Sequence, residues 1–332
     1  MQIRRTLWQP AGDQYRYGKN GNITDEGRYK LMTQLLESGS LWKKIRTRTE
    51  SAIARGALHP IPTDFNIVQQ GGLEFMVRVA HNLNRKTRDK VKQTAIPSSV
   101  PSNPFLPPEP EMTVADITAT HLSVLNKFNV VENHLLIVTR DFQHQEQLLT
   151  LDDFEALWIC LREYPSLGFY NGGAAAGASQ RHKHLQLVPL PLYQGQSGTP
   201  FDALYNNAPQ GEALHSLKQL PFLHCWSPLP GELADNPSAA AKQTLSRYRQ
   251  MLKRVGINIV KNADGDYQSD PYNLLLTRDW MLLVPRSQEH YHGISINALG
   301  YVGSLFVKEP GELETVKRKG PMNLLEAVSI AA

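Results

Sequence analysis

Cysteine is scarce in this chain of 332 residues, which contains two, Cys160 and Cys225. Two cysteines exclude a disulfide scaffold, a four-cysteine zinc site and a CxxC motif, and they are typical of a protein from a reducing cytoplasm. Long apolar runs are missing too: no stretch approaches the roughly 18 apolar residues that a membrane span requires. The first ten residues, MQIRRTLWQP, lack the apolar core of a secretory signal. We therefore expect a cytoplasmic protein without a membrane partner.

A large excess of one charge is also absent. Lys and Arg number 35, Asp and Glu number 31, and the formal net charge at pH 7 is +4. So small a charge argues against nucleic acid as a partner, and any basic site must be local. Hydrophobic residues make up 41% of the chain and charged residues 20%, as in ordinary globular proteins. At roughly 150 residues per domain, the length predicts about two domains.

Periodicity along the chain predicts a mixture of helices and strands. Two alternating apolar runs around a Gly-Gly pair predict a hairpin over 65–79. The prolines of 97–111 exclude a helix or an inner strand there and predict a surface loop. Further elements are expected as strands at 134–140, 168–170 and 181–192, a hairpin at 272–286, helices at 149–164 and 237–256, and a buried helical run at 295–307. Because strands and helices do not alternate regularly, a doubly wound parallel fold is not expected.

Two strand segments are similar to each other. HLLIVTRDFQH at 134–144 and WMLLVPRSQEH at 280–290 share four apolar residues, Thr or Pro, Arg and a final His. Either two unrelated strands leave the sheet into basic loops, or one α+β unit was duplicated. Both explanations stay open on the sequence alone.

The strongest chemical signal is NGGAAAGASQRHKHLQ at 171–186. Because alternate side chains of a β-strand share a face, His182, His184 and Gln186 point one way and the adjoining leucines point into a core. Polar side chains on one face of an apolar strand need partners or a function. Three interpretations stay open at this point: a solvent-facing strand, a zinc site that lacks a good third ligand, and a catalytic face.

A turn rich in glycine and alanine precedes this strand. Its three glycines, Gly172, Gly173 and Gly177, allow the backbone to approach a ligand closely, and successive N–H groups in such a turn can bind an anion. Side-chain donors and cations follow at Ser179, Gln180, Arg181 and Lys183. The turn has neither the Gly-Lys-Ser/Thr of a Walker A loop nor the following helix of a dinucleotide-binding fingerprint. Joined to His-x-His-x-Gln, it predicts a cradle that brings a phosphorus atom to an imidazole.

These motifs, with LNKF at 125–128 before them and YNLLLTRDW and VPRS after them, resemble the ATP adenylyltransferases. These are the diadenosine tetraphosphate phosphorylases of the histidine-triad superfamily, in the branch that contains galactose-1-phosphate uridylyltransferase. The resemblance covers about 65–307. It implies an α+β fold with a histidine-triad-like antiparallel sheet and flanking helices, built as two related units in one compact body. Leucines near helical spacing separately predict a helical extension over 1–64. The resemblance implies a catalytic domain over 65–195 and, over 196–332, a C-terminal adenylyltransferase domain that completes the nucleotide site.

The resemblance implies a reaction through a covalent intermediate. His184, with His182 beside it, would attack the α-phosphate of diadenosine tetraphosphate and release ATP, and phosphate would then release ADP. A backbone carbonyl near His182 is expected to keep the His184 imidazole in its nucleophilic tautomer. The hydrolases of the superfamily carry a third histidine where this chain has Gln186, which does not titrate, so transfer to phosphate is favoured over hydrolysis. The alternatives are hydrolysis and transfer to a sugar phosphate, although the CxxC zinc site of many uridylyltransferases is missing.

The resemblance also assigns binding positions. They are Asn171 and Gln186, the turn residues Gly177, Ala178, Ser179 and Gln180, the pair Asn126 and Lys127, a phosphate-binding Lys86 that Arg88 or Lys90 could replace, and a C-terminal loop of Ser287, Gln288 and Glu289. Backbone amides of 172–179, with Lys86 or Lys127, are expected to stabilise the α-phosphoryl group. The expected ligands are diadenosine tetraphosphate, ATP, ADP and phosphate. We expect no protein metal site and no tightly bound cofactor, only Mg²⁺ that accompanies the polyphosphate.

The remaining polar residues receive structural interpretations. His121, His134 and His144 lie at the ends of predicted elements, and Cys160 is expected to be a buried thiol. Asp152 and Asp153 begin a predicted helix, where carboxylates suit capping better than acid–base catalysis. A second His-x-His, His290 to His292, lies in a predicted loop, and we expect no metal there.

Overall fold

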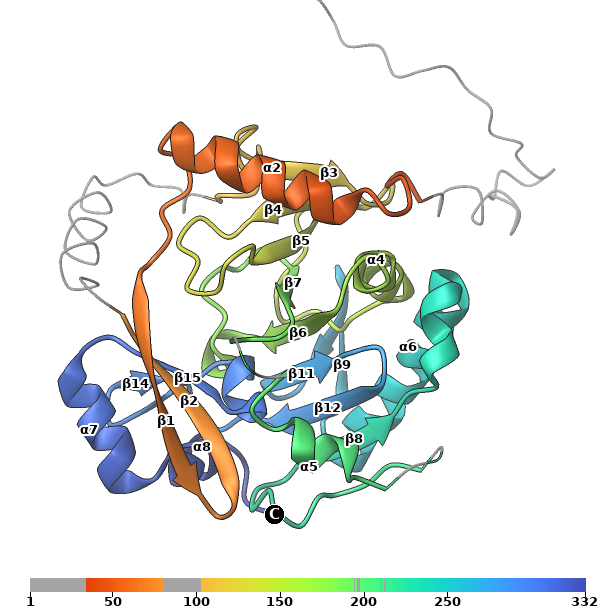
Figure 1. The fold of residues 1–332 in the computed structure, drawn as a ribbon. Coiled ribbons are helices and arrows are strands. Elements are labelled where there is room, and N and C mark those ends of the chain that lie inside the picture. Colours follow the sequence, from red (N-terminus) through yellow and green to blue (C-terminus); the bar gives the residue numbers. More distant parts are fainter. Residues whose placement is uncertain (1–33, 81–102, 194, 196–197, 210, 212) are drawn as a thin grey trace, which may run out of the picture.

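An eight-stranded sheet forms the centre of the computed structural model, which describes residues 34–80, 103–193, 195, 198–209, 211 and 213–332 (Figure 1). The strand order is β3-β4-β5-β7-β6-β11-β12-β8, and every neighbouring pair is antiparallel. In chain order the strands are β3 (Thr113–Asp116), β4 (His121–Leu125), β5 (Leu135–Thr139), β6 (Ser166–Gly172), β7 (His184–Pro189), β8 (Cys225–Pro228), β11 (Tyr272–Leu276) and β12 (Trp280–Pro285). The predicted α+β class with a large antiparallel sheet is therefore confirmed.

The two halves of the chain share this sheet, because β6 pairs directly with β11. The similar segments at 134–144 and 280–290 contribute β5 and β12, each of which is an inner strand with two neighbours. The division into 1–64, 65–195 and 196–332, and the origin from two related units, stay predictions.

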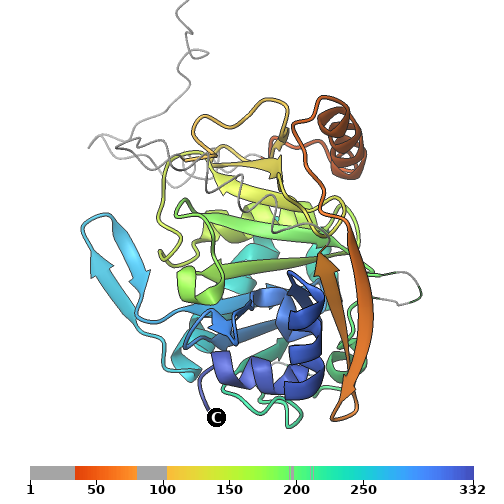
Figure 2. The same cartoon turned by 90° about the vertical axis from the view of Figure 1, so that its left-hand side faces the viewer.

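Smaller sheets accompany the large one. β1 (Thr63–Gln70) and β2 (Leu73–Ala80) form the predicted hairpin, and β15 (Ser304–Val307) joins β2 in parallel. The pairs β9 (Ile259–Asn262) with β10 (Gly265–Gln268) and β13 (His290–Tyr291) with β14 (Ile294–Ser295) complete the strands, and the β9–β10 hairpin projects from the body (Figure 2). The segment 295–307 is mostly buried as predicted, but it does not form the helix expected there. A 3₁₀ turn, η3 (Ala298–Val302), ends at Gly303, whose φ of +81° turns the chain into β15.

Helices cover both faces of the large sheet. On one face, α4 (Leu151–Leu161) and α6 (Pro237–Arg254) pack on a core that contains Leu185 and Leu187, as predicted for the leucines of β7. The other face carries β2, η3 and α8. The remaining helices are α2 (Leu41–Ala54), which packs on β3, α5 (Asp202–Asn206), α7 (Pro310–Lys319) and α8 (Pro321–Val328), with 3₁₀ turns η1 (Ala174–Ala176) and η2 (Gly231–Asp235). None of the described helices is long and apolar enough to span a bilayer.

The start of α4 shows how sequence sets local structure. Thr150 accepts a hydrogen bond from the Asp153 N–H, and the Asp153 carboxylate accepts one from the Thr150 N–H at 2.7 Å. This reciprocal pair satisfies two N–H groups that the helix itself leaves without partners. The expectation that Asp153 caps the helix is confirmed, and the same carboxylate has two further partners, Lys183 just before β7 and His121 on β4.

Candidate active site

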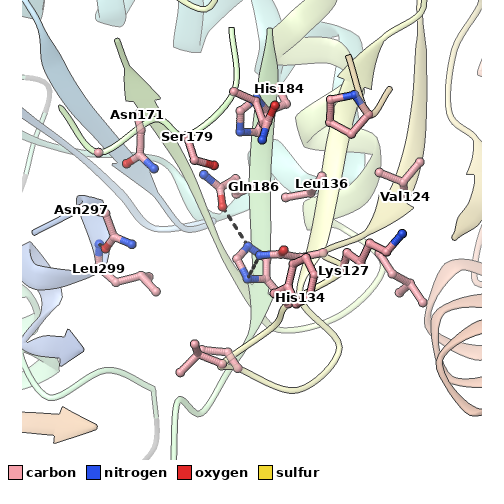
Figure 3. A pocket seen from close by; sticks show the side chains of 18 of the residues that line it. Val124, Lys127, His134, Leu136, Asn171, Ser179, His184, Gln186, Asn297 and Leu299 are labelled. Atoms are coloured by element: carbon pink, nitrogen blue, oxygen red, sulfur yellow. Dashed lines mark hydrogen bonds between the residues drawn. The ribbon is translucent and has the colours of Figure 1, made fainter. Parts of the chain in front are cut away.

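A cavity of about 820 Å³ lies on the face of the large sheet that α4 and α6 leave open. His184, Gln186 and His134 stand in its middle, with Asn171, Ser179 and Asn297 on one side and Val124 and Lys127 on the other (Figure 3). Strands β4, β5 and β7 therefore contribute side chains to it together with the glycine turn and the segment around η3. The sheet brings together most of the positions that the sequence singles out.

His184 is the first residue of β7 and is 4% exposed. Its Nδ1 lies 2.8 Å from the backbone carbonyl of His182. A carbonyl only accepts, so Nδ1 carries the hydrogen and Nε2 keeps its lone pair. The expected carbonyl near His182 is therefore confirmed. Burial lowers the pKa of His184 to about 4, although the hydrogen bond to the carbonyl opposes the shift, and the ring is neutral at pH 7.

His182 acts through its backbone, because its ring is not among the groups that line the cavity. Its Nε2 donates to the Thr139 carbonyl at 2.8 Å, and its Nδ1 accepts from the Asn103 amide at 3.0 Å. Phe105 and Phe142 meet the ring edge-on, with centroids at 5.6 and 5.4 Å. Burial lowers the pKa of His182, and the hydrogen bond to the Thr139 carbonyl and the nearby Asp141 oppose the shift. The fixed ring holds the His182 carbonyl under His184.

Gln186 is oriented by a second histidine. Its Oε1 accepts from Nε2 of His134 at 3.0 Å, and Nδ1 of His134 accepts from the Asn126 amide at 3.1 Å. Burial lowers the pKa of His134 to about 4, so this ring is neutral too. The Gln186 NH₂ group consequently points away from His134, to the side of Ser179 (Figure 3). The prediction that His134 has only a structural role is wrong. His134 lines the cavity and fixes the orientation of the Gln186 amide.

The glycine turn lines the cavity with Gly177, Ser179 and Gln180. Gly177 has φ +91°, and a Cβ there would lie 2.9 Å from Cβ of Asn297, so only glycine fits. The predicted row of free backbone amides is wrong in part. The N–H groups of Gly173, Ala176, Gly177 and Ala178 donate to carbonyls within the turn, and Ala178 does not line the cavity. Ser179 and Gln180 line the cavity and make no hydrogen bond to another described residue, so the turn offers their side-chain donors to a ligand.

The cations are arranged differently from the expectation. Lys127 lines the cavity, and its Nζ lies 2.8 and 2.9 Å from the two carboxylate oxygens of Glu109. Lys183 immediately precedes β7 and its side chain lies on the opposite face of the sheet from His184, fully buried and paired with Asp153 at 3.0 Å. Its place as a cation beside the phosphate cradle is therefore wrong, because neighbouring strand residues point to opposite faces. Lys86, Arg88 and Lys90 lie outside the described residues.

The C-terminal half contributes other residues than expected. Ser287, Gln288 and Glu289 do not line the cavity. The Ser287 N–H and the Gln288 side chain donate to carbonyls of the last helix, and Glu289 accepts from Ser295. The residues that do reach the cavity from this half are Asn297, Leu299, Ser304 and Phe306. η3 and the residues on either side of it thus supply the surface that the loop after β12 was expected to supply.

Sequence reasoning missed the proline-rich segment as part of the site. Phe105 is buried, lines the cavity and lies 5.5 Å from the His184 ring, centroid to centroid. The sequence did contain an indication that this segment packs against the protein. Phe105 is a single aromatic residue among prolines, and large aromatic side chains are usually buried at least in part. Within the part of the chain that the structure describes, no three His, Cys, Asp or Glu side chains gather as metal ligands.

Comparison with known proteins agrees with the geometry over nearly the whole chain. The family model described as the Ap4A phosphorylase N-terminal domain matches residues 32–207, and that of the ATP adenylyltransferase C-terminal domain matches 218–331. Protein APA1 of Saccharomyces cerevisiae is 29% identical over 250 residues, which cover 65% of this chain and 72% of the relative. Diadenosine 5′,5‴-P1,P4-tetraphosphate phosphorylase 2 of the same yeast is 29% identical over 240 residues, with coverage of 64% and 71%.

Solved structures give the same result. The yeast Ap4A phosphorylase Apa2 in complex with AMP matches with a TM-score of 0.72 at 25% identity, covering 90% of this chain and 98% of that one. The same enzyme in complex with Ap4A matches with a TM-score of 0.71 at 25% identity, over 90% and 100%. Since the N-terminal family model alone spans more than half of the 332 residues, the chain belongs to the Ap4A phosphorylase family.

Proposed function

We propose that this protein catalyses the reversible phosphorolysis of diadenosine tetraphosphate (Ap4A) to ATP and ADP through an adenylyl-histidine on His184. The observation that carries the proposal is the bond from Nδ1 of His184 to the His182 carbonyl, which leaves Nε2 as a neutral nucleophile in the cavity. The names of the relatives support it, because the yeast phosphorylase structures were solved with Ap4A or AMP.

The first half-reaction forms the intermediate. The Nε2 lone pair attacks the phosphorus of one terminal adenylyl group, the bond from that phosphorus to the bridging oxygen breaks, and ATP leaves with the electron pair. Nδ1–H keeps its bond to the His182 carbonyl, which stabilises the positive charge that the ring acquires. In the second half-reaction an oxygen of inorganic phosphate attacks the same phosphorus, the P–N bond breaks, its electrons return to Nε2, and ADP leaves.

Donors around the cavity suit the oxygens of the transferred group. The Gln186 NH₂ group, held by His134, and the side chains of Ser179 and Gln180 can donate to phosphoryl oxygens as charge develops. An amide donates without titrating, so Gln186 does not activate water as a general base. This chemistry favours phosphate over water as the second nucleophile. We expect Mg²⁺ to arrive with the polyphosphate, whose oxygens bind it well.

A product assay tests the proposal. Purified protein is incubated with Ap4A and Mg²⁺, with and without inorganic phosphate, and the nucleotides are separated by chromatography. We expect ATP and ADP to accumulate only when phosphate is present. ATP and AMP without phosphate would make the protein a hydrolase, and no reaction would turn attention to transfer onto a sugar phosphate.

We infer a cytoplasmic location as part of this proposal. Cys160 and Cys225 are free and buried, as suits a reducing compartment, and burial raises the pKa of the Cys225 thiol to about 11. Fractionation of cells that express the protein should recover it with cytoplasmic markers, and recovery with organelles would contradict the inference.

A further inference from the structure

Two asparagines and one arginine form a buried hydrogen-bonded chain that ends in the cavity. Asn171 on β6 and Asn273 on β11 lie directly opposite each other in the sheet, and Arg286 follows β12. Their exposed fractions are 2%, 0% and 1%. Asn171 is the member that lines the cavity.

Arg286 fixes the orientation of the Asn273 amide. Its Nη1 donates to Oδ1 of Asn273 at 2.6 Å. The other N–H groups of the guanidinium donate to backbone carbonyls, those of Ala176, Val328, Gln288 and Ile296. Because a guanidinium has donors and no acceptor, Asn273 must present its oxygen to Arg286 and its NH₂ group to the opposite side. A reversed Asn273 would set donor against donor at a buried site, which is costly.

Asn273 in turn fixes the Asn171 amide. Nδ2 of Asn273 donates to Oδ1 of Asn171 at 2.8 Å and to the Ala176 carbonyl at 2.9 Å. The same Oδ1 accepts a second bond from the Ala298 N–H at 3.1 Å. With its oxygen doubly occupied, Asn171 turns its NH₂ group into the cavity (Figure 3). Each amide in the chain therefore has one orientation that matches donors with acceptors.

We propose that Arg286 and Asn273 are positioning residues that hold the two N–H donors of Asn171 toward a phosphoryl group of the nucleotide. This inference rests on the proposed function. A reversed Asn171 would present an oxygen to phosphate oxygens, and two acceptors repel each other. Because the Ala176 carbonyl accepts from both Asn273 and Arg286, the same chain fixes the glycine turn from the C-terminal half of the protein.

Two variants at one position separate orientation from packing. Asn273→Asp keeps the shape and the acceptor for Arg286 but removes the donor to Asn171. Asn273→Ser loses volume but keeps a hydroxyl that can accept from one neighbour and donate to the other. We expect Asn273→Asp to lower kcat/KM for Ap4A about 10²-fold, the size of one lost donor to a reacting oxygen, and Asn273→Ser to lower it less than about tenfold. A position that matters only for packing gives the opposite order, because serine leaves a void, and that order contradicts the proposal.

Asn171→Ala supplies the matched control. In that background no amide is left to orient, so adding Asn273→Asp should lower kcat/KM by no more than about twofold further. If the two losses multiply, the two residues act independently and the proposal is wrong.

Binding of AMP separates this proposal from the proposed function, because it needs no turnover. Calorimetry should show AMP affinity about tenfold weaker in Asn273→Asp than in wild type, and weaker than in Asn273→Ser. Equal affinity in all three overturns the inference. A wild-type protein that makes no ADP and ATP from Ap4A and phosphate overturns the function instead, and the AMP series still decides the inference. If thermal unfolding shows that Asn273→Asp does not fold, Asn273→Ser decides: a loss as large as that of Asn171→Ala contradicts the proposal.

Discussion

Strand β7 and the residue just before it place buried polar side chains on opposite faces of the large sheet, for opposite purposes. On the cavity face, His184 and Gln186 meet neutral partners, a backbone carbonyl and the His134 ring. On the helix face, Lys183 is 0% exposed and its Nζ lies 3.0 Å from the Asp153 carboxylate. Two adjacent residues, Lys183 just before β7 and His184 at its start, thus belong to the scaffold and to the chemistry.

The difference teaches that the partner, not the depth of burial, decides whether a group keeps its charge. Burial opposes the charged form on both faces. Among the described residues no opposite charge contacts His184, so burial lowers its pKa to about 4 and the ring stays neutral. For Asp153, burial acts in the direction of a higher pKa, but the Lys183 ammonium and the hydrogen bond from His121 outweigh it and hold the pKa well below its usual range. The neutral ring of His184 and the charged pair of Asp153 with Lys183 therefore both follow from the partner that each buried group has.

The largest effect is expected at His184. His184→Ala removes the nucleophile, so kcat should fall by at least about 10³-fold, as loss of a nucleophile does in other covalent mechanisms. Folding should be little affected, because the lost hydrogen bond contributes about 1 kcal/mol. Steady-state assay and thermal unfolding measure the two quantities. Retention of activity within tenfold of wild type would remove His184 from the role of nucleophile.

A change on the other face should have the reverse signature. Lys183→Met leaves the Asp153 carboxylate buried beside His121 without its cation, so unfolding free energy should fall by about 3–5 kcal/mol. Chemical denaturation measures this, and turnover per folded molecule should stay closer to wild type than in His184→Ala. The control is Lys183→Met combined with Asp153→Asn, which removes both charges and should recover part of the loss. A fully stable Lys183→Met would show that the ion pair does not matter for folding.

Much of this comparison was predictable from the sequence, and the rest was not, for physical reasons. The period of two along β7 predicted which residues share the face of His184, and the need for a neutral ring predicted a carbonyl partner. The same period should have separated Lys183 from the cavity, but its nearness to the glycine turn suggested a phosphate contact. His134 and Phe105 were missed because their roles depend on pairing of β5 with β7 and on a proline-rich segment folding back, both long-range events. The local sequence pattern predicts which side chains share a face of a strand, whereas their neighbours on other elements depend on how distant segments pair.

The fall in reaction rate at low pH, the acid limb of the pH–rate profile, tests whether His184 is neutral. Its neutral ring is the active form, so protonation inactivates, and with a pKa of about 4 the limb should lie near pH 4 rather than at the ordinary value near 6.5. Release of ATP in single turnovers without phosphate isolates this step. His134 and His184 both have lower pKa values in the folded protein than in the unfolded chain. The free energy of unfolding should therefore fall as the pH drops from about 6.5 toward 4. An acid limb near pH 6.5 would contradict this, because only a negative charge in contact with the buried ring would restore its ordinary pKa.

The smallest effect is expected at the edge of the cavity, where Lys127 and Glu109 are about half-exposed. The ammonium is already bound by both carboxylate oxygens, so a polyphosphate must compete with Glu109 for it. Glu109→Gln removes the competing charge and should lower KM for Ap4A about two- to fivefold, whereas Lys127→Met should raise it by a similar factor, since exposed pairs are weak. In the Lys127→Met background, Glu109→Gln should change KM no further. A higher KM in Glu109→Gln alone would mean that the carboxylate contacts the nucleotide directly. Glu109 would then resemble Asp153, whose negative charge is stabilised by the group that it binds.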